Sequence, residues 1–432
     1  MSARILIAVT HLLGIGHLVR ARQLARALAA AGHEVTLASG GMPDGKAATD
    51  YRFVQLPPVR TQGTDFRNLL DEGGETATPG RLAARREQLV ALACEISPDI
   101  VITEHFPFGR RQLAGEFLAL IAAAREANPQ AHVIASIRDV LVTPQRPERL
   151  TEAAERVATL FDAVLVHGDP SVLPLEASWP VTPEIAGKLV YTGYLAERPA
   201  RALESLAYSL PPACGGEGLG MGGRKAGLSS SSSSQQTALP PTQPSPPQAG
   251  GGLAPNARSE GDTHILVSGG GSAAALPLFE TMLAAARLLP QRPFHLLIGR
   301  GVSEVDFAAL RQSAPDNAVV EWARPDFQAL LATCALSISQ AGYNTALDLL
   351  QAGRPALLLP FDAGNETEQA LRAAALERAG LARVAKLAEG PQALAAAIET
   401  ALAQGVPPAA EVDLNGAEGS VAAIARLLAS RA

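Results

Sequence analysis

Residues 337–369 read SISQAGYNTALDLLQAGRPALLLPFDAGNETEQ, and this stretch decides the fold expected for the chain. An apolar run breaks at Gly342, a helical pattern that contains Asp348 follows, and a second apolar run ends at Pro360. The polar segment after it closes on Gln369. Open α/β sheets bind ligands at the carboxyl ends of parallel strands that are connected in this way. The stretch therefore predicts a polar crevice that binds an anionic ligand.

The composition is that of a globular chain without an excess of basic charge. Of the 432 residues, 47% are hydrophobic and 18% are charged, and the formal net charge is −6. This length predicts two domains, and the acidic balance argues against nucleic acid as a partner. The three cysteines, Cys94, Cys214 and Cys334, lie far apart, which fits neither a zinc site nor a disulfide framework and suits a reducing cytoplasm.

The apolar runs argue against a chain that crosses a membrane. The first run, 5–9, is short and enters a polar His-Gly segment, unlike a secretory signal. No run approaches the ~18 apolar residues that span a bilayer. We therefore expect a cytoplasmic protein, with peripheral contact to the inner face of the membrane left open.

Strand-like and helix-like patterns alternate along the first half of the chain. The apolar run 5–9 is followed by apolar residues at helical spacing from Leu18 to Leu28, by Gly32, and by a second strand pattern at 34–39. Further strands are predicted at 52–56, 99–103, 131–137, 163–167 and 189–192, and helices at 79–95, 113–128 and 147–160. This alternation predicts a mainly parallel sheet with helices on both faces.

A low-complexity segment separates this half from a second α/β half. Of the 50 residues 211–260, 26 are Gly, Pro or Ser, a composition that predicts a disordered insertion. The later strands are predicted at 264–268, 294–298, 318–321, 336–339 and 356–359, and the later helices at 326–332, 345–352, 366–379, 391–403 and 420–430, with another ending near 289. We therefore predict an α/β protein with two Rossmann-like, doubly wound domains, 1–197 and 263–432, facing across a cleft, with the linker and insertion at 198–262.

The first of three glycine-bearing loops is a candidate for acid–base chemistry. The sequence Gly14-Ile15-Gly16-His17 lacks the third glycine of the dinucleotide fingerprint, and no acid ends the next strand, so a nicotinamide cofactor is not expected. His17 stands instead at a helix N-terminus, where the helix dipole favours a neutral imidazole that can act as a base. The alternative is that His17 only caps or packs its helix.

The other two loops favour phosphate binding. The segment SGGGS at 268–272 joins a strand to a helix, and its glycines let backbone N–H groups approach a phosphate. The helix start at 342–345 offers further backbone donors, with Asp348 one turn into the helix. Polar residues follow the next strand, namely Asn365, Glu366, Glu368 and Gln369. The alternatives are a tight turn without a ligand for the first loop, and an acid that only stabilises its own helix for Asp348.

These motifs resemble those of GT-B glycosyltransferases of family 28, the group of the GlcNAc transferase that makes the lipid-linked peptidoglycan precursor. GIGH at 14–17 is similar to the N-terminal loop of the family, and SGGGSAA at 268–274 to its second glycine-rich loop. SQAGYNTALD at 339–348, followed by GRP at 353–355 and NETEQ at 365–369, is similar to its donor-binding region. Within the family, the chain looks most similar to a branch of predicted glycosyltransferases. The resemblance implies a GT-B-like fold for both domains, outside the insertion.

The resemblance also implies which residues bind a nucleotide-sugar donor. Asp348 would hold the ribose hydroxyls, and the donor sugar would be contacted by Gln369, Asn365 and Glu366. The diphosphate would be cradled by Gly270, Gly271, Ser272, Gly342, Tyr343 and Asn344. Backbone at 323–326 would recognise the base, and the expected donor-binding set also includes Gly16 and Arg324. Neither a metal nor a cofactor other than the donor is expected.

A stretch in the first half supplies candidates for the base and for the acceptor side. PDIVITEHFPFGRR, which ends at Arg111, places Glu104 at a strand end, where it would orient His17 or act as the base itself. Arg110 and Arg111, beside two phenylalanines, would receive a phosphate-bearing or lipid acceptor, unless they form only a solvated turn. Asp139 is another strand-end acid on the acceptor side, with the preceding arginine as a candidate ion-pair partner.

The implied reaction is a metal-independent, inverting transfer of a hexose-type sugar from a nucleoside-diphosphate sugar, expected to be UDP-linked, to a hydroxyl acceptor. His17 or Glu104 would take the acceptor proton, and helix N-termini would stabilise the leaving diphosphate. No Asp-x-Asp pair is present that would hold a metal on the diphosphate. The expected partners are the donor and an unidentified acceptor, either lipid-linked or a cell-envelope glycan.

Two alternatives to a transferase stay open at this point. A nucleotide-sugar hydrolase or 2-epimerase on the same fold is also suggested by the pattern formed by Gly14, Gly16, His17 and Arg20. A nucleotide-sugar-binding protein without turnover would bind the donor even after His17 and Glu104 are replaced.

Overall fold

The computed structural model describes residues 2–45, 47–48, 50–62, 65–144, 146–196, 264–271, 273–361, 367–405 and 411–430, without the side chains of 62 and 65–67. The predicted disordered insertion lies outside these residues. The described chain forms two parallel sheets and one antiparallel pair of strands.

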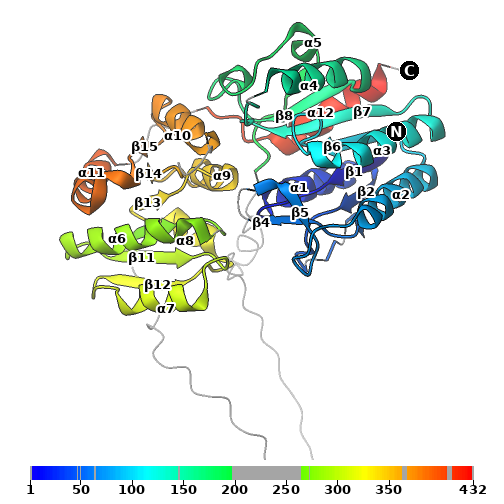
Figure 1. Ribbon diagram of the computed structural model, residues 1–432. Coiled ribbons are helices and arrows are strands. Elements are labelled where there is room, and N and C mark those ends of the chain that lie inside the picture. The colour runs from blue at the N-terminus through cyan, green and yellow to red at the C-terminus, as the bar shows by residue number, and fades with distance from the viewer. Residues whose placement is uncertain are drawn as a thin grey trace, which may run out of the picture. The chain divides into compact units, whose positions relative to one another are not determined.

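The first domain is built on a seven-stranded parallel sheet in the order β3-β2-β1-β6-β7-β8-β9 (Figure 1). Its elements are β1 (Arg4–Val9), α1 (Gly16–Ala30), β2 (Glu34–Ser39), β3 (Arg52–Gln55), α2 (Pro79–Ile96), β6 (Ile100–Glu104), η1 (Arg111–Leu113), α3 (Ala114–Ala127), β7 (His132–Arg138), α4 (Pro147–Leu160), β8 (Ala163–His167), η2 (Leu175–Ala177), α5 (Pro183–Ala186) and β9 (Leu189–Tyr191). The antiparallel pair consists of β4 (Arg60–Gln62) and β5 (Asp65–Leu70).

The second domain is built on a six-stranded parallel sheet in the order β12-β11-β10-β13-β14-β15 (Figure 1). Its elements are β10 (Ile265–Ser268), η3 (Ala273–Ala275), α6 (Leu276–Leu288), β11 (Phe294–Ile298), α7 (Glu304–Gln312), β12 (Ala318–Trp322), α8 (Phe327–Thr333), β13 (Leu336–Ser339), α9 (Tyr343–Ala352), β14 (Ala356–Leu358), α10 (Glu368–Arg378), β15 (Arg383–Val384), η4 (Leu387–Glu389) and α11 (Gly390–Gln404). Both sheets confirm the predicted pair of Rossmann-like folds.

Both faces of the first sheet are covered by helices, and its central strands are apolar at most positions. In β1, Ile5 and Ile7 point to the face covered by α1, whereas Leu6 and Ala8 point to the face covered by α2 and α3. Successive side chains of a strand alternate between faces, so a continuous apolar run fits only a sheet covered on both sides. Each fully buried Leu or Ile contributes roughly 1.5–3 kcal/mol.

The last helix, α12 (Gly416–Ala429), packs on the first domain although it follows the second in sequence. Ala423 and Ile424 join the core that contains Ile5 and Leu24. A Cβ atom on Gly419 would lie 2.1 Å from the carbonyl oxygen of Thr192, so only glycine permits this close approach. The sequence-based division grouped this helix with residues 263–432, whereas its core contacts place it with the first domain.

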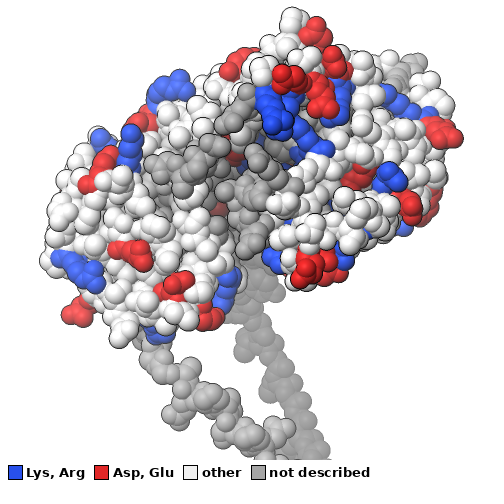
Figure 2. Space-filling model, viewed as in Figure 1, with Lys and Arg blue, Asp and Glu red and all other residues white. Residues whose placement is uncertain are grey.

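Among the helices of the described residues, none is both long and apolar enough to cross a membrane. On the face drawn in Figure 2, acidic and basic side chains are interspersed rather than gathered into one basic patch. This distribution agrees with the small negative net charge.

Candidate active site

Polar side chains gather at the carboxyl ends of four neighbouring strands of the first sheet. Glu104 ends β6, Ser136 lies near the end of β7, His167 ends β8, and Thr192 follows β9. Because the strands are parallel and Glu104 pairs in register with Ser136, the four residues lie side by side at the carboxyl ends of their strands. The exposed fraction of each is 2% or less, so the cluster is internal and its polar atoms need partners.

Glu104 is the centre of this cluster, and both of its carboxylate oxygens are engaged. Oε1 lies 2.9 Å from Nδ1 of His17 and also accepts a hydrogen bond from the guanidinium of Arg20. Oε2 accepts a 2.6 Å hydrogen bond from the hydroxyl of Ser136. A carboxylate held on both sides in this way keeps one orientation.

His17 is the second residue of α1, and its ring faces Glu104. Burial lowers the pKa of His17 well below its ordinary value, and the charges of Arg110 and Arg20 lower it further. The imidazole is therefore neutral at pH 7. Because a carboxylate only accepts, the 2.9 Å contact assigns the proton to Nδ1 and leaves Nε2 with its lone pair. A terminal nitrogen of Arg20 lies 3.1 Å from the same Nδ1, and with the proton on Nδ1 this guanidinium donates to Glu104 rather than to His17. His17 thus has the form required of a base.

The two arginines predicted for the acceptor side are in different surroundings. Arg110 has a left-handed backbone conformation, and its Nε donates a 2.6 Å hydrogen bond to the carbonyl of Thr10. Burial, followed by the charge of Arg138, lowers the pKa of Arg110 to about 10. Arg111 interacts electrostatically with the charged residues of α4, namely Arg149, Glu152 and Arg156. Of the pair, it is Arg110 whose charge acts on the cluster around Glu104.

Asp139 is not available to an acceptor, which corrects the prediction made for it. Its carboxylate is fully buried and receives two hydrogen bonds, of 2.8 and 2.6 Å, from Arg372 of α10. Arg138, the candidate ion-pair partner of Asp139, pairs instead with Glu368. The tertiary fold brings Arg372, 233 positions away, onto Asp139, and sequence adjacency did not indicate this partner.

In the second domain, the loop after β10 is shaped by close backbone contacts. A Cβ atom on Gly299, which follows β11, would lie 2.0 Å from the carbonyl oxygen of Gly270. Gly270 itself has a φ of +69°, a conformation that favours glycine. Gly270 and Gly271 are exposed on this loop, which leaves their backbone N–H groups accessible to a ligand. The predicted Ser272 lies outside the described residues.

Helix α9 begins at the expected turn with backbone donors available. Gly342 is its N-cap residue, and no side chain caps the helix, so the first-turn N–H groups can bind an anion. The side chain of Tyr343 does not take part, because it is buried and its hydroxyl donates to the carbonyl of His167 at 2.9 Å. Asn344 lies beside Gly16, with 3.6 Å between its Nδ2 and a Cβ built on that glycine.

The remaining donor-side residues are spread over three places. Asp348 accepts a 3.2 Å hydrogen bond from Gln328 of α8. The amide oxygen of Gln369 accepts hydrogen bonds from the backbone of Ala341 and Phe361, at 3.1 and 3.0 Å, which leaves its NH₂ group for a ligand. Asn365 and Glu366 lie outside the described residues. Arg324 is 44% exposed and pairs with Asp326 and Glu321.

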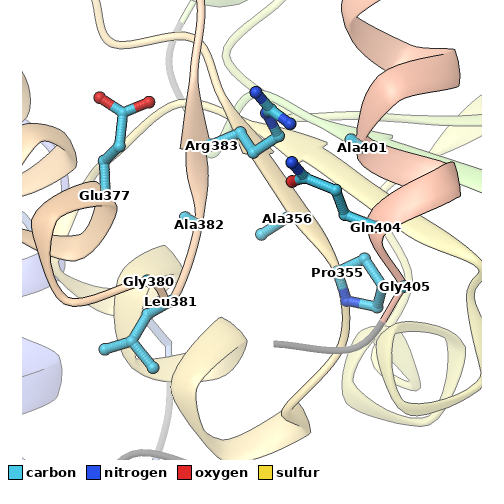
Figure 3. Close-up of a pocket in the computed structure, with 10 residues that line it drawn as sticks. All are labelled: Pro355, Ala356, Glu377, Gly380, Leu381, Ala382, Arg383, Ala401, Gln404 and Gly405. Carbon is cyan, nitrogen blue, oxygen red and sulfur yellow. The ribbon is translucent and has the colours of Figure 1, made fainter. Parts of the chain in front are cut away.

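A separate crevice of about 290 Å³ lies at the amino ends of strands β14 and β15 of the second sheet (Figure 3). Pro355 and Ala356 at the start of β14, Arg383 at the start of β15 and Gln404 at the end of α11 line it. Ligands of open α/β sheets bind at the carboxyl ends of the strands, so this amino-end crevice is not the candidate site.

Sequence reasoning did not select several residues of the site, namely Ser136, His167, Thr192 and Arg372. The first three follow a common signal, which is a polar side chain at the end of an otherwise apolar parallel strand. That signal selected Glu104 and would have selected these as well. Arg20 was noted only as part of a motif, and its direct contact with Glu104 could not be read from it.

The fold defined by these two sheets is shared with GT-B glycosyltransferases. MurG from Acinetobacter baumannii superimposes with a TM-score of 0.56 at 16% identity, covering 98% of this chain and 99% of that one. The calicheamicin glycosyltransferase CalG4 gives a TM-score of 0.55 at 14% identity, covering 99% of this chain and 94% of that one. At such low identity these similarities establish the fold alone.

Sequence comparison defines the family of the second half. Residues 264–426 match the model of the glycosyltransferase family 28 C-terminal domain. The UDP-N-acetylglucosamine–N-acetylmuramyl-(pentapeptide) pyrophosphoryl-undecaprenol N-acetylglucosamine transferases of Brucella suis and Brucella abortus are 34% identical over 138 residues, 31% of this chain. The matched region spans about a third (36%) of those relatives. The second half of the chain therefore belongs to glycosyltransferase family 28, as its C-terminal domain.

Proposed function

We propose that the protein transfers a sugar from a nucleoside-diphosphate donor to a hydroxyl group of an acceptor. The observation that carries the proposal is the pairing of a neutral His17 with the buried Glu104, in a chain whose second half is a family 28 domain. The Brucella relatives are named for transfer from UDP-N-acetylglucosamine. Their name supports a UDP-linked donor carrying a hexose-type sugar.

His17 is the proposed base, and Glu104 orients it. The burial of Glu104 and the engagement of both its oxygens favour this assignment over the reverse. Nε2 of His17 takes the proton of the acceptor hydroxyl while the acceptor oxygen bonds to the anomeric carbon. The bond from that carbon to the diphosphate oxygen breaks, and its electron pair leaves with the diphosphate. A single displacement of this kind inverts the anomeric configuration.

The donor is proposed to bind at the carboxyl ends of the strands of the second sheet. Backbone N–H groups at the start of α9 and at Gly270 and Gly271 stabilise the diphosphate as its charge develops, without a metal. Asp348 holds the ribose, and the NH₂ group of Gln369 contacts the sugar. The family resemblance supports Ser272 as a further contact to the diphosphate, Asn365 and Glu366 as contacts to the sugar, and Arg324 as a member of the donor-binding set. It also supports a reaction without any cofactor besides the donor.

Arg110 is the proposed contact for an anionic group on the acceptor. Its charge acts on the Glu104 cluster, and its Nε is fixed on Thr10, which leaves the two terminal nitrogens of the guanidinium to bind the anion. The acceptors named for the Brucella relatives carry a pyrophosphoryl group on a lipid. This supports a lipid-linked acceptor, reached at the inner face of the membrane.

The proposal is tested by a product screen of the purified protein against nucleotide sugars and lipid-linked acceptors, with detection by mass spectrometry. His17→Ala should stop turnover while donor affinity is kept, and Asp348→Ala should weaken donor binding. Arg110→Ala should raise the KM for the acceptor, and Arg111→Ala is its matched control. Activity that is lost in EDTA and restored by Mg²⁺ would contradict the metal-independent mechanism.

The position of Arg20 favours a second candidate function, that of a nucleotide-sugar hydrolase or 2-epimerase on the same fold. This arginine completes the Gly-x-Gly-His-x-x-Arg pattern, and its guanidinium touches both His17 and Glu104. In a hydrolase, water would replace the acceptor hydroxyl. Incubation of the donor alone separates the two, because rapid release of free sugar without an acceptor indicates hydrolysis and an epimerised sugar indicates the 2-epimerase.

A further inference from the structure

A chain of buried hydrogen bonds continues beyond Glu104, away from His17. The hydroxyl of Ser136 lies 2.6 Å from Oε2 of Glu104 and 3.0 Å from Nε2 of His167. Nδ1 of His167 lies 2.9 Å from the hydroxyl of Thr192. The exposed fractions of Ser136, His167 and Thr192 are 1%, 0% and 2%. Four neighbouring strands thus supply one continuous polar row at the carboxyl ends of a mostly apolar sheet.

The direction of each hydrogen bond follows from the carboxylate. Because an ionised carboxylate only accepts, Ser136 must spend its single proton on Glu104. The 3.0 Å contact then requires Nε2 of His167 to donate to Ser136. Nδ1 of His167 is left as an acceptor for the hydroxyl of Thr192, and at 2.9 Å it lies nearer to this hydroxyl than the carbonyl oxygens of Gly193 and Val166, at 3.1 and 3.3 Å. The opposite direction would place a serine lone pair 2.6 Å from a carboxylate oxygen, which is repulsive.

The arrangement requires a neutral His167, and its surroundings keep it neutral. Burial, followed by the charge of Arg20, lowers the pKa of His167 to about 3. Its backbone is fixed as well, because its carbonyl accepts the hydroxyl of Tyr343. A neutral ring in a fixed place holds the serine hydroxyl at a fixed angle.

We propose that Ser136 and His167 are positioning residues that hold Glu104 so that its other oxygen fixes the Nδ1–H tautomer of His17. This inference rests on the proposed function, in which His17 is the base. Without Ser136, Oε2 loses a donor, the carboxylate can turn, and Nε2 of His17 no longer points along one line. Without the hydrogen bond from Ser136, more of the negative charge of Glu104 also acts on His17, which stabilises the protonated imidazole and raises the pKa of His17 relative to the wild type.

The first test compares Ser136→Ala with Ser136→Thr, which keeps the hydroxyl. The loss of one hydrogen bond to a charged group corresponds to about 10- to 100-fold in rate. We therefore expect kcat to fall by that factor in Ser136→Ala, the KM for the donor to stay within about twofold, and the acid limb of the pH profile to move to higher pH. Ser136→Thr should regain most of the rate.

The matched control is Ser420→Ala on α12. Ser420 is also fully buried, but its hydroxyl donates to the carbonyl of Gly416 in its own helix. Its removal should leave kcat and the pH profile unchanged. Equal rates in wild type and Ser136→Ala, or equal loss in Ser136→Ala and Ser136→Thr when both are folded, would overturn the proposal.

The second test needs no turnover. Nitrogen-15 NMR of the imidazoles, assigned through His17→Gln and His167→Gln, reports tautomer and titration directly. We expect His167 as the Nε2–H tautomer and a raised titration midpoint for His17 in Ser136→Ala. An Nδ1–H tautomer at His167, or an unchanged His17 titration, would refute the positioning role. Absence of product with every donor, beside the expected NMR result, would refute the proposed function alone.

Discussion

Replacement of Asp139 by Asn tests whether this residue stabilises the protein rather than binds an acceptor. The side chains of Asp139 and Arg372 are 0% and 2% exposed, and two hydrogen bonds of 2.8 and 2.6 Å join them. Nη1 of Arg372 also donates to the carbonyl of Ala341 at 2.8 Å. Within the part of the chain that the structure describes, Asp139 is thus the one carboxylate at hydrogen-bond distance from this buried guanidinium.

The expected loss of stability is large because the variant leaves the arginine charged and buried. Removal of one partner of a buried ion pair costs about 3–5 kcal/mol, a large part of the roughly 5–15 kcal/mol that stabilises a typical protein. Replacement of both residues, Asp139→Leu with Arg372→Met, removes the charge together with its countercharge. Most of the lost stability should return in that double variant.

Urea unfolding followed by tryptophan fluorescence measures these changes. The chain has two tryptophans, Trp179 in the first domain and Trp322 in the second, so both domains report. The control is Glu95→Gln, which breaks the exposed pair with Arg52 and should leave the urea midpoint unchanged. An Asp139→Asn midpoint equal to wild type would refute the reasoning, and a raised acceptor KM with unchanged stability would restore Asp139 to the acceptor site.

Three further predictions concern pH and the glycine loop. The kcat should be flat near pH 7 and fall only well below pH 6.5, since the lowered pKa of His17 keeps it neutral there, and a steady-state pH profile with an acid limb above pH 7 would contradict this. The free energy of unfolding should fall by about 1.4 kcal/mol per pH unit from pH 6.5 towards pH 3 through His167 alone, because below pH 6.5 this histidine is protonated in the unfolded chain but stays neutral in the folded protein. In His167→Gln, the urea midpoint should therefore depend less steeply on pH over this range. Gly299→Ala should weaken donor binding in calorimetry, as its Cβ would displace Gly270, whereas Gly115→Ala, with open space around it, should not.

The two sheets were predictable because each strand is a short apolar run between helices with clear starts. The pair β4 and β5 was missed because β4 is short and polar, and the apolar residues of β5, Phe66, Leu69 and Leu70, do not alternate as in a half-buried strand. Helix α7 was missed although Ser303 caps it by accepting from the backbone of Asp306, a start signal present in the sequence. The attachment of α12 to the first domain depends on contacts between residues more than 200 positions apart, which no local pattern encodes.

The candidate site was predictable only where chemistry coincides with a local element boundary. His17 opens a helix and Glu104 closes a strand, so both could be selected from the sequence, and the structure joins them at 2.9 Å. Asp139 also closes its strand region, yet its partner lies 233 positions away and turns it into a buried structural residue. The local sequence indicates where a residue lies in its helix or strand, whereas the tertiary fold determines which side chain it contacts.

Tyr343 shows why the acid–base cluster and the donor-binding turn have to be considered together. It is the first residue of α9, so its backbone lies at the proposed diphosphate site. Its ring lies under the guanidinium of Arg20, 5.2 Å from the ring centre, and its hydroxyl donates to the carbonyl of His167. Burial raises the pKa of Tyr343, so the hydroxyl keeps the proton that makes this bond. One side chain therefore links the start of α9, the proposed phosphate-binding helix, to Arg20 and His167 of the cluster around Glu104. In the proposed reaction, a base and a leaving group held by different sheets have to be fixed relative to one another to act on one anomeric carbon, and Tyr343 contributes directly to that positioning.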